Sequence, residues 1–191
     1  MRMSKVIDLR RLRKPAAAAA VIAALLLLAC WAFSWYYPLK HIGIIRKYAA
    51  EYGLAPSLVC AVIHAESKFD EAALSRKGAS GLMQIVRGSA DWAAAEIGIP
   101  GYDYSRVREP EINIRIGCWL LARLTAQFGD TDTALAAYNA GSGNVSKWLK
   151  NPAYSADGVR LTSAPFRETE NYLRRVRFNL EIYRFILGDE A

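Results

Sequence analysis

The sequence contains only two histidines, His41 and His64, which excludes a histidine-rich metal site. His64 precedes Glu66 with the His-x-Glu spacing of zinc deaminases, but the Pro-Cys-x-x-Cys half of that signature is missing from the chain. No convincing run of alternating apolar and polar residues indicates a strand. We therefore expect an all-α or mainly α protein that uses neither a metal nor another cofactor.

Little net charge remains once the first 15 residues are set aside. Those residues hold six Lys plus Arg against one Asp, whereas residues 38–191 hold 19 Lys plus Arg against 17 Asp plus Glu. The positive charge is local, so we expect no nucleic-acid partner. Basic residues that precede an apolar segment instead follow the positive-inside rule for membrane proteins.

Residues 16–37 carry no charged side chain. As a helix these residues would span about 33 Å, close to the thickness of a bilayer's hydrocarbon core. We predict a basic cytoplasmic segment at 1–15, a transmembrane anchor at 16–37 and one compact domain at 38–191 outside the cytoplasm. Aromatic residues gather at the far end of the apolar run, as in an interfacial belt: Trp31, Trp35, Tyr36 and Tyr37.

Two alternatives to a retained anchor stay open. Residues 27–30 resemble a lipoprotein cleavage box, in which Cys30 would be lipidated, and ordinary signal cleavage is the other alternative. The apolar run continues past Cys30, and Leu28 fits such a box poorly, so the retained anchor is favoured. All three interpretations place the domain outside the cytoplasm.

The two remaining cysteines, Cys60 and Cys118, both lie in apolar helical contexts. A disulfide between them is conceivable in an oxidising compartment, but no sequence feature supports its geometry. Two buried thiols are the favoured interpretation.

Helical periodicity dominates the chain after residue 38. It predicts helices over 40–52, 56–67, 89–97, 110–129, 144–149 and 167–187, together with a shorter one from Asp132 or Thr133 to Ala140. Loops are expected at 68–80 and 151–165, and a short apolar turn or helix at 81–85.

Glu66 is placed at the end of an apolar helix. Val62 and Ile63 precede it by four and three residues, so Glu66 leaves from the buried face. Partial burial and the negative end of the helix dipole both disfavour the carboxylate, which would keep the carboxyl protonated as a general acid requires. The alternative is a solvent-facing residue at the helix end.

Four short segments combine unusual polar residues with apolar neighbours: 66–69, 81–85, 137–141 and 165–172. They read Glu-Ser-Lys-Phe, Gly-Leu-Met-Gln-Ile, Ala-Tyr-Asn-Ala-Gly and Pro-Phe-Arg-Glu-Thr-Glu-Asn-Tyr. The four segments occur in the order of the signatures of one enzyme family. Over residues 42–187 the chain resembles the lytic transglycosylases with a soluble-lytic-transglycosylase (SLT) catalytic domain.

The resemblance implies a lysozyme-like α-helical fold and an enzyme of cell-wall remodelling. Such enzymes cleave the β-1,4 bond between N-acetylmuramic acid and N-acetylglucosamine in peptidoglycan and form a 1,6-anhydro sugar. The implied partners are peptidoglycan glycan strands and the cytoplasmic membrane, and no protein partner is indicated.

Glu66 matches the family's single catalytic acid. It would protonate the glycosidic oxygen and then, as a base, deprotonate the muramic acid 6-hydroxyl. Ordinary glycosidases use two carboxyl groups, but Asp70 and Glu71 follow too closely to lie opposite Glu66. The substrate's own N-acetyl group is implied to stabilise the reacting centre.

Further site residues follow from the resemblance, each with a structural alternative. Gln84 matches a cleft amide that both donates to and accepts from acetamido groups, or is a helix-end amide. Ser75 matches a serine near the muramic acid, or caps a turn. Tyr138 and Asn139 match the cleft wall, where Asn139 could instead be held by its own backbone.

Glu168 and Tyr172 are four residues apart and share a helical face. Tyr172 matches a tyrosine whose hydroxyl lies near the catalytic acid, and Glu168 matches an acid on the substrate side. The alternative for Glu168 is a carboxylate stabilised by the start of a helix. Met83 and Phe69 are expected in the core.

Two other functions remain as rivals. A true lysozyme would use water in place of the sugar hydroxyl, and a noncatalytic domain would only bind peptidoglycan. The intact Glu66 and Tyr172 argue against a pure binder.

Overall fold

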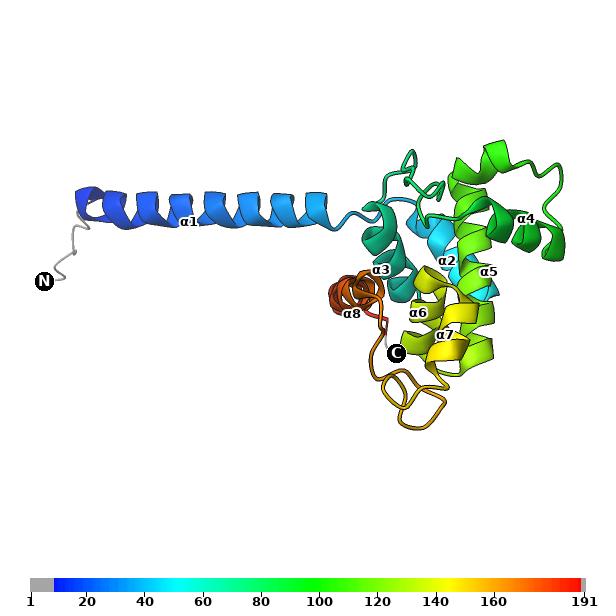
Figure 1. The fold of residues 1–191 in the computed structure, drawn as a ribbon. Helices are drawn as coiled ribbons and strands as arrows, with labels where there is room; N and C mark the ends of the chain where they lie inside the picture. The colour runs from blue at the N-terminus through cyan, green and yellow to red at the C-terminus, as the bar shows by residue number, and fades with distance from the viewer. Residues whose placement is uncertain (1–8, 190–191) are drawn as a thin grey trace, which may run out of the picture. The chain divides into compact units, whose positions relative to one another are not determined.

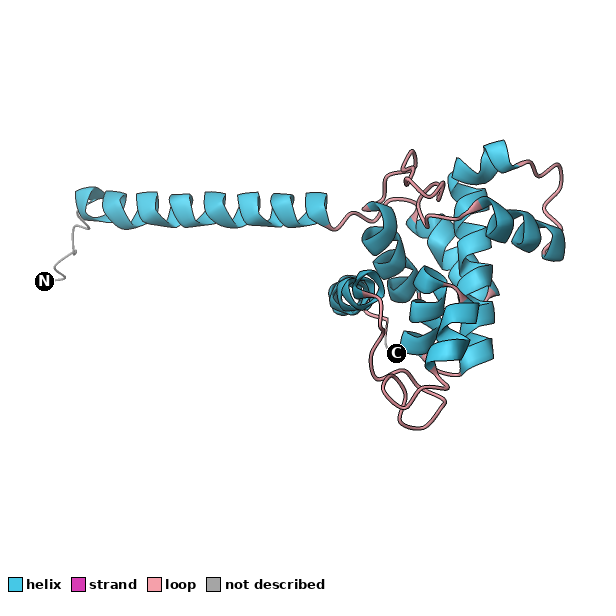
Figure 2. Ribbon diagram, viewed as in Figure 1, coloured by secondary structure: helices cyan, strands magenta, loops and turns pink. Residues whose placement is uncertain are grey.

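The computed structural model describes residues 9–189, and the chain divides into two compact units, Met1–Pro38 and Leu39–Ala191. Within the described range the secondary structure is helical and contains no β-strand, only isolated bridges at Leu74–Ser80 and Ser80–Ile85 (Figure 2). The expectation of an all-α protein is therefore confirmed.

The described part of the first unit contains one helix, α1 (Leu9–Tyr36) (Figure 1). Its stretch Ala19–Tyr36 is long and apolar enough to cross a membrane, and none of it is buried; the helix of a signal sequence would meet the same criterion. Cys30 lies on this helix as an exposed free thiol. Of the basic segment predicted at 1–15, residues 1–8 lie outside the described residues.

The second unit contains the remaining helices, in chain order: α2 (Ile42–Glu51), α3 (Pro56–Ser67), α4 (Arg87–Glu96), the 3-10 helix η1 (Tyr104–Arg108), α5 (Pro110–Phe128), α6 (Thr131–Ala140), α7 (Ser142–Trp148) and α8 (Arg167–Leu187). Most boundaries agree with the periodicity to within two residues. The short η1 was not predicted. The cap of α6 also differs from expectation, since the Asp130 side chain, not Asp132 or Thr133, accepts a hydrogen bond from the Thr133 amide.

Helix α5 runs through the middle of this unit (Figure 1). Pro110 begins it, where a missing N–H is tolerated, and Gly129 ends it with a φ of 67° that favours glycine. Its apolar residues recur at helical spacing, so that Ile114 and Leu121 are fully buried against α2, α4 and α6. The helix thereby forms the expected core of the domain.

Helix α3 packs chiefly against α8 (Figure 1). All its residues from Ser57 to His64 are buried, and the fully buried Tyr172 and Tyr183 lie on α8. The start of α3 is capped from far along the chain, because Asp189 Oδ2 accepts a 2.8 Å hydrogen bond from the Ser57 amide. The start of this helix is therefore fixed by a segment 132 residues further along the chain.

Cys60 on α3 and Cys118 on α5 are buried, free thiols, as the sequence favoured. Burial raises the pKa of Cys60 to about 12, and burial with the neighbouring Cys60 raises that of Cys118 further. Both thiols are therefore unreactive at neutral pH.

Candidate active site

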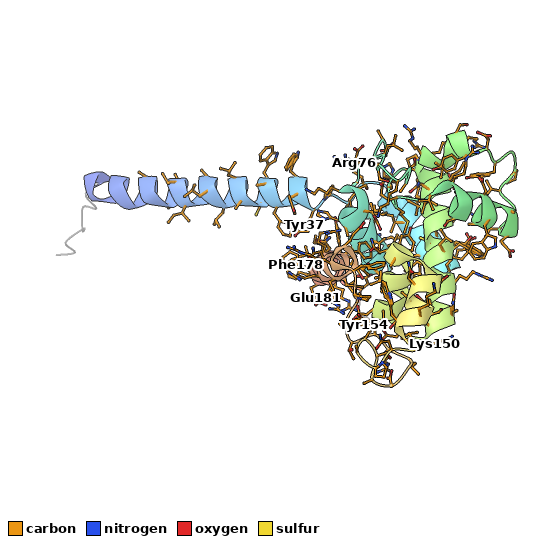
Figure 3. The ribbon with its side chains drawn as sticks, in the orientation of Figure 1. Tyr37, Arg76, Lys150, Tyr154, Phe178 and Glu181 are labelled. Atoms are coloured by element: carbon orange, nitrogen blue, oxygen red, sulfur yellow. The ribbon has the colours of Figure 1, made fainter. Side chains whose placement is uncertain are left out.

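A cavity of about 710 Å³ brings together the end of α3, the loop before α4, one side of α4 and α5, the α6–α7 turn and the start of α8. Arg76 lines it from the loop between α3 and α4 (Figure 3). Among the residues predicted for the site, those that line the cavity are Glu66, Ser75, Gln84, Tyr138, Asn139 and Glu168.

Glu66 occupies the last turn of α3. The chain then reverses sharply, because Lys68 and Phe69 adopt left-handed backbone conformations with φ of 53° and 64°. Ser67 Oγ donates a 2.8 Å hydrogen bond to the Leu82 carbonyl, which ties the end of α3 to the segment 81–85. This bond keeps Glu66 and Gln84 at fixed relative positions although 17 residues lie between them in the sequence.

The carboxyl of Glu66 is only partly exposed, and burial is the main reason that its pKa rises to about 7. The negative charge of Glu168 raises the pKa further, whereas the Tyr172 hydroxyl and Arg175 lower it. A carboxyl with this pKa is present in both protonation states near neutral pH, so it can act first as an acid and then as a base.

Tyr172 is fully buried and does not line the cavity, so it is placed to act on Glu66 and not on a substrate. This agrees with the expected tyrosine whose hydroxyl lies near the catalytic acid. Its hydroxyl makes no hydrogen bond of ordinary geometry within residues 9–189, yet its approach lowers the pKa of Glu66. Burial and the charge of Glu66 in turn raise the pKa of Tyr172 well above its usual value.

The segment 81–85 is fixed by Asn113, a buried residue of α5. Its Oδ1 accepts a 2.7 Å hydrogen bond from the Met83 amide, and its Nδ2 donates to the Ser80 and Val107 carbonyls at 3.0 and 2.7 Å. Sequence analysis missed Asn113. The available signal was a single amide within an otherwise apolar helical face, which must find polar partners when buried.

Gln84 has a left-handed φ of 48°, which turns its side chain back onto its own segment. Its Nε2 donates to the Gly81 carbonyl at 2.9 Å and to the Ala73 carbonyl at 3.2 Å. Since both amide hydrogens are used internally, Gln84 offers the cavity only its Oε1 acceptor. The expectation that it both donates and accepts is therefore too broad.

Ser75 lines the cavity and also caps a turn. Its Oγ accepts hydrogen bonds from the amides of Lys77 at 3.2 Å and Ala79 at 2.9 Å. The hydroxyl hydrogen remains to be donated.

Tyr138 and Asn139 both lie at the end of α6 and use side-chain bonds to distant segments. The Tyr138 hydroxyl donates to the Met83 carbonyl at 2.9 Å, and burial beside Glu66 raises the pKa of Tyr138 well above its usual value. Asn139 Oδ1 accepts from Thr169 Oγ1 at 2.9 Å, so Asn139 is held by α8 and not by its own backbone. Its Nδ2 remains as a donor.

Glu168, in the first turn of α8, lines the cavity. Lys77 Nζ lies 3.1 Å from its Oε2, with both side chains largely exposed. Exposed pairs of this kind contribute little to stability. Glu168 is the one further acid among the described residues of the cavity wall, and this ion pair engages it.

The other acids near Glu66 in sequence are absent from the cavity wall as described. Asp70 Oδ1 accepts from the Ala72 amide, and Glu71 lies 2.8 Å from His41 Nε2. In the described part of the chain, no group of three or more His, Cys, Asp or Glu side chains could hold a metal ion. The chemistry available to the cavity therefore centres on one carboxyl group.

The comparison with known proteins agrees with this geometry. The chain is 36% identical over 157 residues to the soluble lytic murein transglycosylase of Escherichia coli K12, covering 81% of this chain and 24% of that protein. It is 32% identical over 138 residues to a membrane-bound lytic murein transglycosylase C of Yersinia pestis, covering 66% of this chain and 38% of that protein. The chain thus spans between a quarter and two fifths of these relatives.

The fold matches a solved structure equally well. An inactive glutamate-to-glutamine mutant of the lytic transglycosylase Slt from Pseudomonas aeruginosa superimposes with a TM-score of 0.72 at 32% identity, covering 81% of this chain and 25% of that one. The expected lysozyme-like, all-α transglycosylase fold is confirmed. Residues 43–158 match the transglycosylase SLT domain family, and the chain belongs to that family.

Proposed function

We propose that the protein is a membrane-anchored lytic transglycosylase that cleaves the β-1,4 bond between N-acetylmuramic acid and N-acetylglucosamine in peptidoglycan. The observation that supports this most directly is one carboxyl group with a pKa of about 7 in a large cavity. The relatives are named as murein transglycosylases, and a mutant of one that replaces a glutamate by glutamine is described as inactive.

The first step uses Glu66 as a general acid. Its proton passes to the glycosidic oxygen, the bond to the anomeric carbon of the muramic acid breaks, and the N-acetylglucosamine leaves as an alcohol. In the second step the Glu66 carboxylate accepts the proton of the muramic acid 6-hydroxyl, whose oxygen bonds to the anomeric carbon. Glu66 is then protonated again, so the cycle is balanced without water.

A positive charge develops at the anomeric carbon between these steps. A glycosidase with two carboxyl groups can place the second one there as a nucleophile, whereas Glu168 is largely exposed and pairs with Lys77. The acetamido oxygen of the substrate can take this role. Gln84 Oε1 as an acceptor and Asn139 Nδ2 as a donor would orient the acetamido groups.

Product analysis tests the reaction. Purified sacculi treated with the wild-type protein should yield muropeptides with 1,6-anhydro ends by mass spectrometry, and Glu66→Gln should yield none. Glu181→Gln is a matched control, because Glu181 is exposed on α8 and pairs with Arg184 away from the cavity (Figure 3). Reducing ends would indicate a lysozyme, and sacculus binding without products would indicate a noncatalytic binder.

Anchoring is the second part of the proposal. The helix α1 contains a stretch of sufficient length and apolarity, and one relative is named membrane-bound. We place residues 1–15 in the cytoplasm, 16–37 in the membrane and 38–191 outside. The protein should stay with membranes after an alkaline carbonate wash and be cut by protease added to spheroplasts.

The same fractionation separates the anchor from lipidation at Cys30. If the helix is retained, the Cys30→Ser variant should stay in the membrane fraction. Its mass should differ from that of the wild type only by the substitution. Two results would establish the lipoprotein alternative: release of the Cys30→Ser variant from the membrane, or a fatty-acid label that the wild type carries and the variant lacks.

A further inference from the structure

Two tryptophans and an arginine form a stacked cluster on the side of the cavity built by α4 and α5. The rings of Trp92 and Trp119 meet edge to face with their centroids 4.9 Å apart. The Arg123 guanidinium carbon lies 5.0 Å from the Trp92 centroid and 5.4 Å from that of Trp119. Trp92 and Arg123 line the same cavity as Glu66.

Both indole rings contact the guanidinium group of Arg123. Arg123 is an exposed side chain, and a long exposed side chain would ordinarily sample many rotamers. Contact with two indole rings restricts these rotamers. The guanidinium makes no hydrogen bond or ion pair within residues 9–189, so its planar N–H edge is free to bind a ligand. Such an edge matches the two oxygens of a carboxylate.

The cavity has a surplus of positive charge that no described residue balances. Its wall carries three basic residues, Arg76, Lys77 and Arg123, and two acidic ones, Glu66 and Glu168. Lys77 and Glu168 pair with each other, whereas neither Arg76 nor Arg123 forms an ion pair within residues 9–189. An anionic group on the substrate would supply the missing charge.

We propose that the cluster of Trp92, Trp119 and Arg123 binds a carboxylate of the acidic peptide attached to the glycan strand. The inference rests on the proposed function, because it takes peptidoglycan as the substrate. The cluster makes the protein discriminate between glycan that carries peptides and glycan that has lost them. Arg123 supplies the charge-assisted hydrogen bonds, and the two indoles hold it in place.

A sugar ring stacked on Trp92 is the competing occupant. Trp92 is 43% exposed, so its face could also cover the apolar side of a pyranose. The two occupants differ in what they require of residue 123, because a sugar stack needs the indole but not the charge. Arg123→Gln removes the charge, and Arg123→Lys keeps the charge but loses the planar fork.

Binding is measured in the full chain with Glu66→Gln, so that no cleavage occurs. The two probes are soluble glycan strands of equal length, titrated by calorimetry. One keeps its peptides, and the other has lost them to an amidase, which leaves only the lactyl carboxylate on each muramic acid and so tests whether the peptide's own carboxylates are recognised. We expect the peptide-bearing strand to bind about tenfold more tightly, and Arg123→Gln to abolish this preference. Arg123→Lys should retain part of it. Arg174→Gln, which alters an exposed arginine of α8 away from the cavity, should retain all of it.

Equal weakening of both strands by Arg123→Gln would overturn the proposal in favour of a sugar contact, and no weakening of either would overturn it outright. Should Arg123→Gln fail to fold, the same comparison with Arg123→Lys decides. Failure of the proposed function would show separately, as an absence of anhydro ends from the wild-type protein, because the binding preference does not depend on cleavage.

Discussion

The hydroxyl of Ser67 donates a 2.8 Å hydrogen bond to the carbonyl of Leu82, a residue that is fully buried. This single bond joins the helix that carries Glu66 to the segment that carries Gln84. The position of the acid therefore depends on a loop that follows it in sequence.

Ser67→Ala should lower both stability and activity. The substitution leaves the buried Leu82 carbonyl without this partner, at a cost of about 1–3 kcal/mol in the free energy of unfolding. Urea denaturation would give the loss, and kcat on soluble glycan strands should fall several-fold because Glu66 and Gln84 are no longer held together. Ser67→Thr keeps the hydroxyl and should recover most of both. Unchanged stability in Ser67→Ala would show that the bond is unimportant.

The raised pKa of Glu66 predicts a pH-dependent activity. The carboxyl must be protonated to donate to the leaving oxygen, so kcat/KM should fall about tenfold per pH unit above a midpoint near 7. A rate profile between pH 4 and 9 checks this. An alkaline limb centred near 4.5, the ordinary value, would contradict the burial of the group.

The same shift predicts a pH-dependent stability. The pKa of Glu66 is higher in the folded state than in the unfolded state. Its contribution to the free energy of unfolding is therefore fully present below about pH 4.5 and is lost as pH rises through 7. The full loss is roughly 3 kcal/mol for a shift of this size. Glu66→Gln, which cannot ionise, should therefore gain stability over the wild type as pH rises from 4.5 to 8. Thermal unfolding of both proteins at both pH values checks this. A difference in stability between Glu66→Gln and the wild type that does not change with pH would contradict the prediction.

Tyr172→Phe separates a positioning role from a structural one. The Tyr172 hydroxyl lowers the pKa of Glu66, so its removal should shift the alkaline limb of the rate profile to higher pH. The hydroxyl has no regular hydrogen bond within the described residues, so stability should be unchanged or slightly higher below about pH 4.5, where Glu66 is protonated. Above pH 7 stability should fall, because the folded-state pKa of Glu66 has risen further. A lower melting temperature with an unshifted profile would mean that Tyr172 acts only through packing.

Gly117→Ala on α5 should displace the segment 81–85 that packs against it. A Cβ at this position would lie 2.2 Å from Met83 Sδ and 3.0 Å from Met83 Cβ, and Met83 is fully buried. We expect a loss of about 1–3 kcal/mol and reduced activity, because Met83 contacts both Asn113 and Tyr138 through its backbone. Gly43→Ala is the matched control. Its Cβ would meet nothing within 4 Å, so it should be neutral or stabilising. Equal effects of the two substitutions would contradict this account.

Much of the fold is predictable from the chain alone because its strongest signals are local. The spacing of apolar residues in α5 and α8, with Pro110 and Gly129 as boundaries, depends on a few consecutive turns. The location of Glu66 in the last turn of α3 follows in the same way.

The parts that were missed depend on contacts between distant segments. The buried partners of Asn113 come from the segment before it and from η1, and the burial of Tyr172 requires that α8 pack on α3. Likewise, nothing in the local sequence around Trp92 indicates that Arg123 would stack on it from another helix. Such pairs have no periodic signature, so only the folded chain reveals them.

The left-handed backbone at Lys68, Phe69 and Gln84 has an evolutionary consequence. Each such residue costs roughly 1 kcal/mol relative to glycine, and all three lie in the two segments that frame Glu66. Selection for thermal tolerance would therefore favour glycine at these positions, whereas selection for catalysis would retain the side chain of Gln84, which lines the cavity. The segments 66–69 and 81–85 are thus where stability and turnover are expected to trade against each other during adaptation.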